Sequence, residues 1–259
     1  VAVGFQSQAI AGISGGSCDD GSSDHDNDAC TTDSCTPGTG QCAHADLASC
    51  AGAPDIDHFL CYESHRTPLN LENVSLVDQF GESTVTVKRA KRLCAPANKE
   101  NEDPAAVTAA EHLTAYTIKQ TTPFTRESGV TVVNQFGTIV VDLYRPERLL
   151  VPTAESLKES PPELADPGDH FKCYRVRGAR APRRSVTIIT QLGRGQVTVE
   201  VKQPRHLCAP ANKWNEAPGA ENHPLHLMCY QVEAPTRRPF GVFTSDQFGL
   251  VTSARDPRI

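Results

Sequence analysis

Four copies of a short motif divide most of this chain into units of equal length. The motif is Gln-Phe-Gly beginning at Gln79, Gln135 and Gln247, and Gln-Leu-Gly beginning at Gln191. Successive copies begin 56 residues apart, at positions 79, 135, 191 and 247. A fixed period of this kind indicates duplication of one structural unit. The chain is therefore expected to fold as an array of four related units.

Two further signatures accompany each copy. A His-x-x-x-Tyr stretch lies upstream, at residues 58–62, 112–116, 170–174 and 226–230. Downstream, residues 93–99 and 207–213 share the identical sequence Leu-Cys-Ala-Pro-Ala-Asn-Lys. The first and third units resemble each other most, so duplication of a two-unit domain is expected. The predicted segments are a leader strand and linker (1–17), a Cys-rich module (18–52), a first β domain (55–155), a linker (156–166) and a second β domain (167–259) whose last strand is missing.

The pattern within each unit is typical of β-strands. Residues 83–88 and 196–201 alternate between valine and more polar residues, as half-buried strands do. A unit of this size has too small a core to fold alone. We therefore expect an all-β protein with two tandem β-sandwich or barrel-like domains, each made of two repeats of about 56 residues, preceded by a small disulfide-rich N-terminal module.

The repeats also predict disulfide pairs. Cys61 and Cys94 occupy signature positions that become Ala115 and Leu150 in the second unit, and both cysteines return as Cys173 and Cys208 in the third. Two cysteines that disappear together are expected to be bonded, which predicts Cys61–Cys94 and Cys173–Cys208. Each bond closes a loop of just over thirty residues, worth about 3–4 kcal/mol on the chain-entropy model.

The remaining cysteines form two groups, and each group has an odd number of members, so neither can pair completely within itself. Cys229 has no partner under this rule, and the N-terminal module holds five cysteines, at Cys18, Cys30, Cys35, Cys42 and Cys50. Cys229 is expected either to bond with that module or to have its partner on the strand missing from the fourth unit. Ten cysteines in 28.0 kDa indicate an oxidising compartment. The chain begins at Val1 instead of Met, which fits a secreted protein after removal of a signal peptide.

Two resemblances follow from these motifs. Residues 18–50 contain Cys-Asp-Asp-Gly, Cys-Thr-Thr-Asp-Ser-Cys and Gly-Gln-Cys-Ala-His. They resemble the short cysteine-rich repeat of slime-mould extracellular matrix proteins, over about an eighth of the chain. The four units, with their Cys-Tyr, Gln-Phe-Gly and Leu-Cys-x-Pro signatures, resemble an uncharacterised family of secreted bacterial proteins. These resemblances imply a surface or matrix location and bring no known activity.

An acidic insertion interrupts the slime-mould pattern. It places Asp24, Asp26 and Asp28 at alternating positions, as calcium-binding loops do. An EF-hand would require a glycine at Ala29 and a glutamate at Cys35, so the loop is not of that type. It is predicted either to bind calcium in another geometry or to be a solvated acidic loop.

The leader and the fourth unit have complementary features. Val1, Val3 and Phe5 form an alternating apolar pattern outside every repeat, followed by a glycine- and serine-rich tether. The fourth unit lacks a Leu-Cys-Ala-Pro strand. Donation of the leader strand to a neighbouring copy would complete that unit and build a filament. The alternatives are a frayed terminus and a strand that folds back onto its own chain.

The other motifs do not point to catalysis. Gly12-Ile13-Ser14-Gly15-Gly16 matches a hydrolase nucleophile motif but lies in the flexible leader. One histidine recurs in each unit, which favours a role in the fold. The sequon at Asn73 is a candidate glycosylation site. Five arginines cluster within ten residues and are expected either to bind an anionic polysaccharide or to protect a sheet edge: Arg175, Arg177, Arg180, Arg183 and Arg184.

These observations favour a non-enzymatic extracellular structural protein, a subunit of a fibre, sheath or surface coat that associates with itself. The alternative is a secreted adhesion module that binds a carbohydrate or another ligand at the cell surface. The net charge of −6 argues against a nucleic-acid partner, and no apolar run is long enough to span a membrane. No cofactor is expected beyond the candidate calcium ion.

Overall fold

The computed structural model of the protein describes residues 2–10, 31–35, 42–46, 57–64, 68–165, 167–178, 183–193, 195–233 and 241–253. For residues 2–10, 31–35, 42–46 and 250–253 only the backbone is described. Strands dominate the described residues, so the all-β prediction is confirmed. The only helical elements among them are two short 3₁₀ turns, η1 (Pro104–Thr108) and η2 (Ala220–Asn222). No helix in this described part is long and apolar enough to cross a membrane.

Each unit contributes a first strand, a second strand and a long third strand. The first strands are β4 (Phe59–Glu63), β8 (Glu111–Gln120), β11 (His170–Arg177) and β14 (Leu225–Glu233). The second strands are β5 (Leu71–Asp78), β9 (Glu127–Asn134), β12 (Arg184–Ile189) and β15 (Val242–Asp246). The third strands are β6 (Gly81–Pro96), continued by β7 (Asn98–Lys99), then β10 (Gly137–Ser156) and β13 (Val197–Lys213). In the fourth unit, β16 (Gly249–Ser253) pairs with β15.

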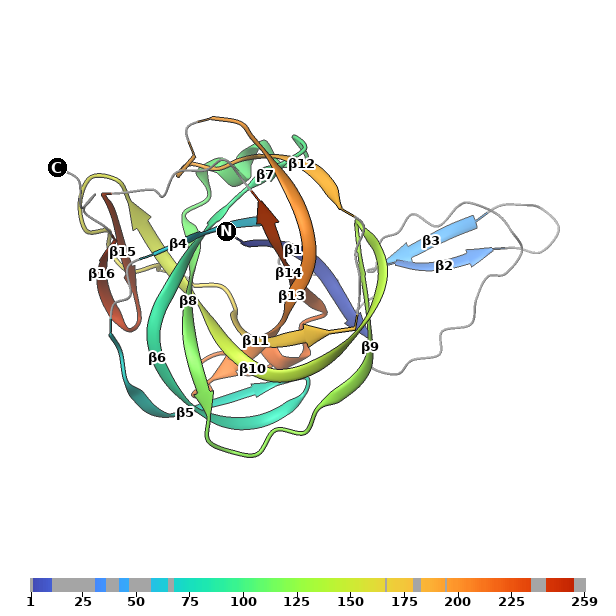
Figure 1. The fold of residues 1–259 in the computed structure, drawn as a ribbon, viewed down its shortest axis with the longest axis horizontal. Coiled ribbons are helices and arrows are strands. Elements are labelled where there is room, and N and C mark those ends of the chain that lie inside the picture. Colours follow the sequence, from blue (N-terminus) through green and yellow to red (C-terminus); the bar gives the residue numbers. More distant parts are fainter. Residues whose placement is uncertain are drawn as a thin grey trace.

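The first and third strands form a closed ring of antiparallel pairs (Figure 1). Following the pairings from β10 leads through β8, β6, β4, β1, β14, β13 and β11 back to β10. The ring joins all four units, so the expected division into domains at 55–155 and 167–259 is replaced by one barrel-like sheet. A sheet built from only two units would expose unpaired strand edges. Joining two such sheets into one ring removes those edges. The predicted linker at 156–166 connects two neighbouring strands, β10 and β11, of the same sheet.

The leader strand β1 (Ala2–Ile10) fills the one position that the fourth unit leaves open. It pairs with β14 and β4, as each third strand pairs with the first strand of its own unit and of the next. The register also matches, because Gly4 lies opposite Cys229 as Cys94 lies opposite Cys61. In this structure the strand therefore completes its own chain. Donation to a neighbouring copy, predicted on Val1, Val3 and Phe5, stays a prediction, and Val1 lies outside the described residues.

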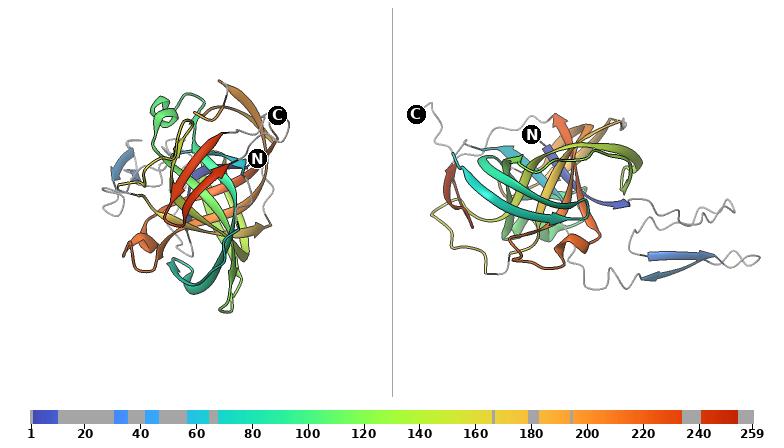
Figure 2. Two further views of the ribbon diagram at one scale, coloured as in Figure 1. Left: turned by 90° about the vertical axis from the view of Figure 1, so that its left-hand side faces the viewer. Right: turned by 90° about the horizontal axis from the view of Figure 1, so that it is seen from below.

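Side chains alternate between the two faces of the ring. Phe59 and Cys61 on β4, with their counterparts in the other units, form a core cluster inside the ring. Leu60 and Tyr62 face the opposite side and pack with valines of the second strands, such as Val132. The second strands thus cover the outside of the ring. A separate hairpin, β2 (Thr31–Cys35) with β3 (Cys42–Asp46), lies apart from this sheet (Figure 2).

Two disulfides cross the interior of the ring. Cys61 is bonded to Cys94 and Cys173 to Cys208, the two pairs expected from their joint replacement in the second unit. Each joins directly opposed residues of a first and a third strand. Cys18, Cys30 and Cys50 lie outside the described residues, as do Asp24, Asp26 and Asp28. Only the backbone of Cys35 and Cys42 is described, so the N-terminal pairing and the calcium site stay predictions.

Candidate functional site

The repeated tyrosines and turns tie opposite units together. In each of four cases a buried tyrosine hydroxyl bonds to the residue that precedes the Gln-Phe-Gly or Gln-Leu-Gly turn, two units away. The pairs are Tyr62–Thr190 (2.7 Å), Tyr116–Asp246 (2.7 Å), Tyr174–Asp78 (2.5 Å) and Tyr230–Asn134 (2.8 Å). The turn phenylalanine packs edge-on against the same tyrosine, as with Phe80 on Tyr174 at 5.2 Å between ring centroids. These signatures therefore hold the fold together.

The repeated histidines have a similar structural role. His58 Nε2 lies 3.2 Å from Gln135 Nε2, and His112 Nε2 lies 3.1 Å from Gln191 Nε2, so each histidine contacts the turn of the next unit. Burial lowers the pKa of His112 to about 4, which keeps the ring neutral at pH 7. This agrees with the role in the fold that the sequence favours for these histidines.

A charged cavity is lined by residues of the first and third strands of the ring. Its volume is about 420 Å³. We call its charged lining the arginine cleft: Glu63, Arg92, Glu147, Arg148, Arg175, Arg205 and His206. Gln231 and Val232 complete the wall.

The repeat itself builds this cleft. Arg92, Arg148 and His206 occupy equivalent places on β6, β10 and β13, two residues before Cys94, Leu150 and Cys208. Because alternate residues of a strand share a face, these three side chains lie on the interior face of the ring. The strand register shifts just before each of them. Such bulges re-aim side chains and often lie beside functional sites.

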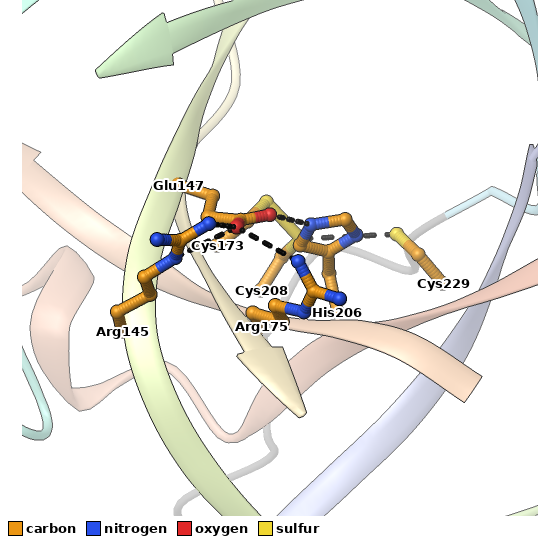
Figure 3. Close-up of polar contacts among 7 residues, drawn as sticks. All are labelled: Arg145, Glu147, Cys173, Arg175, His206, Cys208 and Cys229. Atoms are coloured by element: carbon orange, nitrogen blue, oxygen red, sulfur yellow. Dashed lines mark hydrogen bonds and ion pairs between the residues drawn. A yellow bond between two sulfur atoms is a disulfide. The ribbon is translucent and has the colours of Figure 1, made fainter. Parts of the chain in front are cut away.

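The carboxylate of Glu147 is held by three neighbours, of which the two arginines offset its charge (Figure 3). Its oxygens lie 2.6 Å from Arg145 Nη2, 3.5 Å from Arg175 Nη1 and 3.0 Å from His206 Nε2. The hydrogen bond from His206, with the nearby Arg145, holds the pKa of Glu147 at about 2. This carboxylate is therefore ionised at neutral pH and fully engaged. It adds little net negative charge to the cleft.

Arg148 lies next to Glu147 in sequence, but two of its nitrogens lack a hydrogen-bond acceptor in the described part of the chain. Its Nε and Nη1 atoms are buried and make no hydrogen bond to the described residues. Burial and repulsion from Arg92 lower the pKa of its guanidinium, although arginine stays charged in proteins. A buried cation without hydrogen-bond acceptors is costly. An anionic group bound in the cleft would supply those acceptors.

A layer of sulfur atoms forms the floor beneath the cleft. Cys229 has a free thiol, and its Sγ lies 3.7 Å from Sγ of Cys208 (Figure 3). Burial raises the pKa of this thiol to about 11, so it is protonated and unreactive at neutral pH. The sequence left open a partner on the missing strand. That position belongs to β1, where the opposing residue is Gly4.

The sequence located only part of this site. Of the five clustered arginines, Arg175 lines the cleft, while Arg177 stacks on Tyr144 and Arg183 pairs with Glu200. Arg184 lies over the Phe136 ring, and Arg180 lies outside the described residues. Asn73 is exposed, with a left-handed φ of 59° beside a bulge in β5, and its glycosylation stays a prediction.

Sequence reasoning missed Arg92, Arg148 and His206. One charged residue in each of three distant strands forms no local cluster. The signal that finds them is the alignment of the repeats on their Leu-Cys or Leu-Leu pairs, which places all three in one column. Within the described side chains, no group of three histidine, cysteine or acidic residues is arranged to hold a metal ion.

Comparison with known families gives one match to this closed, disulfide-bonded array of repeats. A family model described as a repeat of unknown function, DUF7450, matches residues 112–255. The match spans more than half of the chain, and the protein belongs to this family. Residues 18–50 lie outside the match, and their resemblance to the slime-mould repeat stays a prediction. No curated protein and no solved structure matches the chain.

Proposed function

We propose that this is a non-enzymatic extracellular binding protein that holds an anionic group in the arginine cleft. Arg148 carries the proposal, because it lines the cavity and two of its buried nitrogens have no acceptor among the described residues. The cleft is also locally cationic on a chain whose net charge is −6. Such a contrast concentrates anions at one site. Two disulfides in the ring are consistent with an oxidising, extracellular environment.

Replacing Arg148 with glutamine tests this function. We expect the Arg148→Gln variant to bind small di- and tricarboxylates such as citrate about tenfold or more weakly, since hydrogen bonds to charged groups contribute about 1.5–3 kcal/mol. Isothermal titration calorimetry at low ionic strength measures the change. Arg183→Gln is the control, because it removes an equal charge from an exposed side chain outside the cleft. Equal citrate binding by both variants and the unchanged protein, or no binding by any of them, would refute the proposal.

A second candidate function is self-association by exchange of β1. One observation favours it: β1 and the fourth unit match in register although a long segment of chain separates them. An exchanged strand makes the same pairs with a neighbouring copy, which is how domain swapping builds assemblies. Repetition of the exchange would give the fibre or coat that the sequence favours.

A Gly4→Cys variant distinguishes exchange from closure within one chain. The register places the new thiol opposite Cys229, as Cys94 lies opposite Cys61, so a disulfide is expected there. If strands are exchanged, oxidation gives covalent oligomers on a non-reducing gel, and reduction removes them. Cys229→Ser in the same background is the control. If the oxidised sample contains only monomers, and the thiols at position 4 and at Cys229 have both reacted, the strand is not exchanged.

A further inference from the structure

The arginine cleft does not end at Arg148. A second cavity, of about 550 Å³, adjoins it and shares Glu147 and Arg148 as a common wall. The outer cavity adds two cations, Lys91 and Lys119, besides Arg145, which is paired with Glu147. Glu147 is the only acidic residue among the described residues that line it, and its charge is offset by Arg145 and Arg175. The two cavities are therefore neighbours on either side of Glu147 and Arg148, and cationic residues line both of them.

The outer cavity also carries an unsatisfied acceptor. Gln120 donates its amide hydrogens to the carbonyl oxygens of Thr122 and Pro123, at 3.1 and 3.3 Å. These bonds fix the amide orientation. Its Oε1 atom is buried and has no donor among the described residues. A hydroxyl group of a ligand would satisfy this oxygen, whereas a phosphate or carboxylate would be repelled by it.

Phe124 gives the outer cavity an apolar surface. Its ring is partly buried, packs at 5.3 Å between centroids against Tyr174 and lines the cavity beside Gln120. One wall therefore offers a fixed aromatic ring, a hydroxyl acceptor and flanking cations. A chain of sugar rings that carry both hydroxyl and acidic groups matches all three features.

We propose that the two cavities together bind one segment of an acidic polysaccharide, with a carboxylate at Arg148 and a neighbouring sugar hydroxyl donating to Gln120 Oε1. This inference rests on the proposed anion-binding function and names its ligand class. The orphaned donor atoms of Arg148 and the orphaned acceptor of Gln120 lie in adjoining cavities. Each needs a different chemical group, and a uronic-acid polymer supplies both.

Chain length and chemistry of the probe test this inference. Calorimetry on the full chain would compare galacturonic acid, galacturonate oligomers of two to eight sugars, polyphosphate and single-stranded DNA. We expect affinity to rise at least tenfold from the single sugar to the longer oligomers. The Lys91→Gln, Lys119→Gln double variant should lower that oligomer-to-monomer ratio about tenfold. Lys158→Gln, an exposed site outside both cavities, should leave the ratio unchanged.

Gln120→Leu separates recognition of hydroxyl groups from charge attraction. It should weaken uronate oligomers by about tenfold and should not weaken polyphosphate binding, because polyphosphate has no hydroxyl to donate along its chain and the lost oxygen repels phosphate. Near-ultraviolet circular dichroism confirms that each variant is folded. Oligomers that bind no tighter than galacturonic acid would overturn this inference but not the anion-binding function. Polyphosphate or DNA that binds as tightly as the uronate oligomers would also overturn it. If no anion binds, both proposals fail.

Discussion

Removal of residues 1–10 is expected to prevent stable folding of the ring. Strand β1 lies between β14 and β4, and at its end it also pairs with β9. Its loss would expose the hydrogen-bonding edges of both neighbours and open the interior cluster to water. We expect a loss of more than about 5 kcal/mol, a large part of the stability of an ordinary domain. The thermal midpoint should fall by more than about 10 °C.

A synthetic peptide with the sequence of residues 1–10 provides the matching control. Added to the truncated chain, it should restore cooperative thermal unfolding and raise the midpoint with increasing peptide concentration. A peptide with Gly4→Pro should restore much less, because proline cannot donate a hydrogen bond within a central strand. Calorimetry measures all three samples. A truncated chain that unfolds at the unchanged midpoint would show that β1 does not close the ring.

Acidification between pH 6.5 and 4 is expected to destabilise the protein through three buried histidines. Burial lowers the pKa of His112 and His226 to about 4 and that of His170 to about 3. Each shift favours the neutral ring in the folded state, whereas an unfolded histidine takes up a proton near pH 6.5. Their stabilising contribution is therefore complete above pH 6.5 and is lost as the pH falls to the folded-state values. Each loss is worth about 3 kcal/mol.

Histidine variants isolate this effect from other titrating groups. Burial raises the pKa of Asp78 and Asp246, which opposes the histidine effect as the pH falls. Replacing His226 with glutamine should reduce the loss of unfolding free energy between pH 6.5 and 4 by about 3 kcal/mol. Urea unfolding at four pH values measures the slopes, and equal slopes for His226→Gln and the unchanged protein would contradict the prediction.

The sequence by itself determined the unit, its strands and two of its bonds. The period of 56 residues, the alternation of valines and the joint loss of Cys61 and Cys94 in the second unit are local or pairwise features. Each can be read without knowing how the units meet. The same patterns identified the leader as a strand and the fourth unit as incomplete.

Only the tertiary structure decided how the units are joined. Closure through β1, the bond from Tyr174 to Asp78 two units away and the meeting of Arg92, Arg148 and His206 all depend on contacts between distant segments. The similarity between the first and third units records duplication and does not show which strand edges pair, so one sheet takes the place of the expected two-domain division. Periodicity shows which face a side chain occupies. Which distant side chains share that face depends on closure of the sheet, and closure places Arg148 in the lining of a cavity.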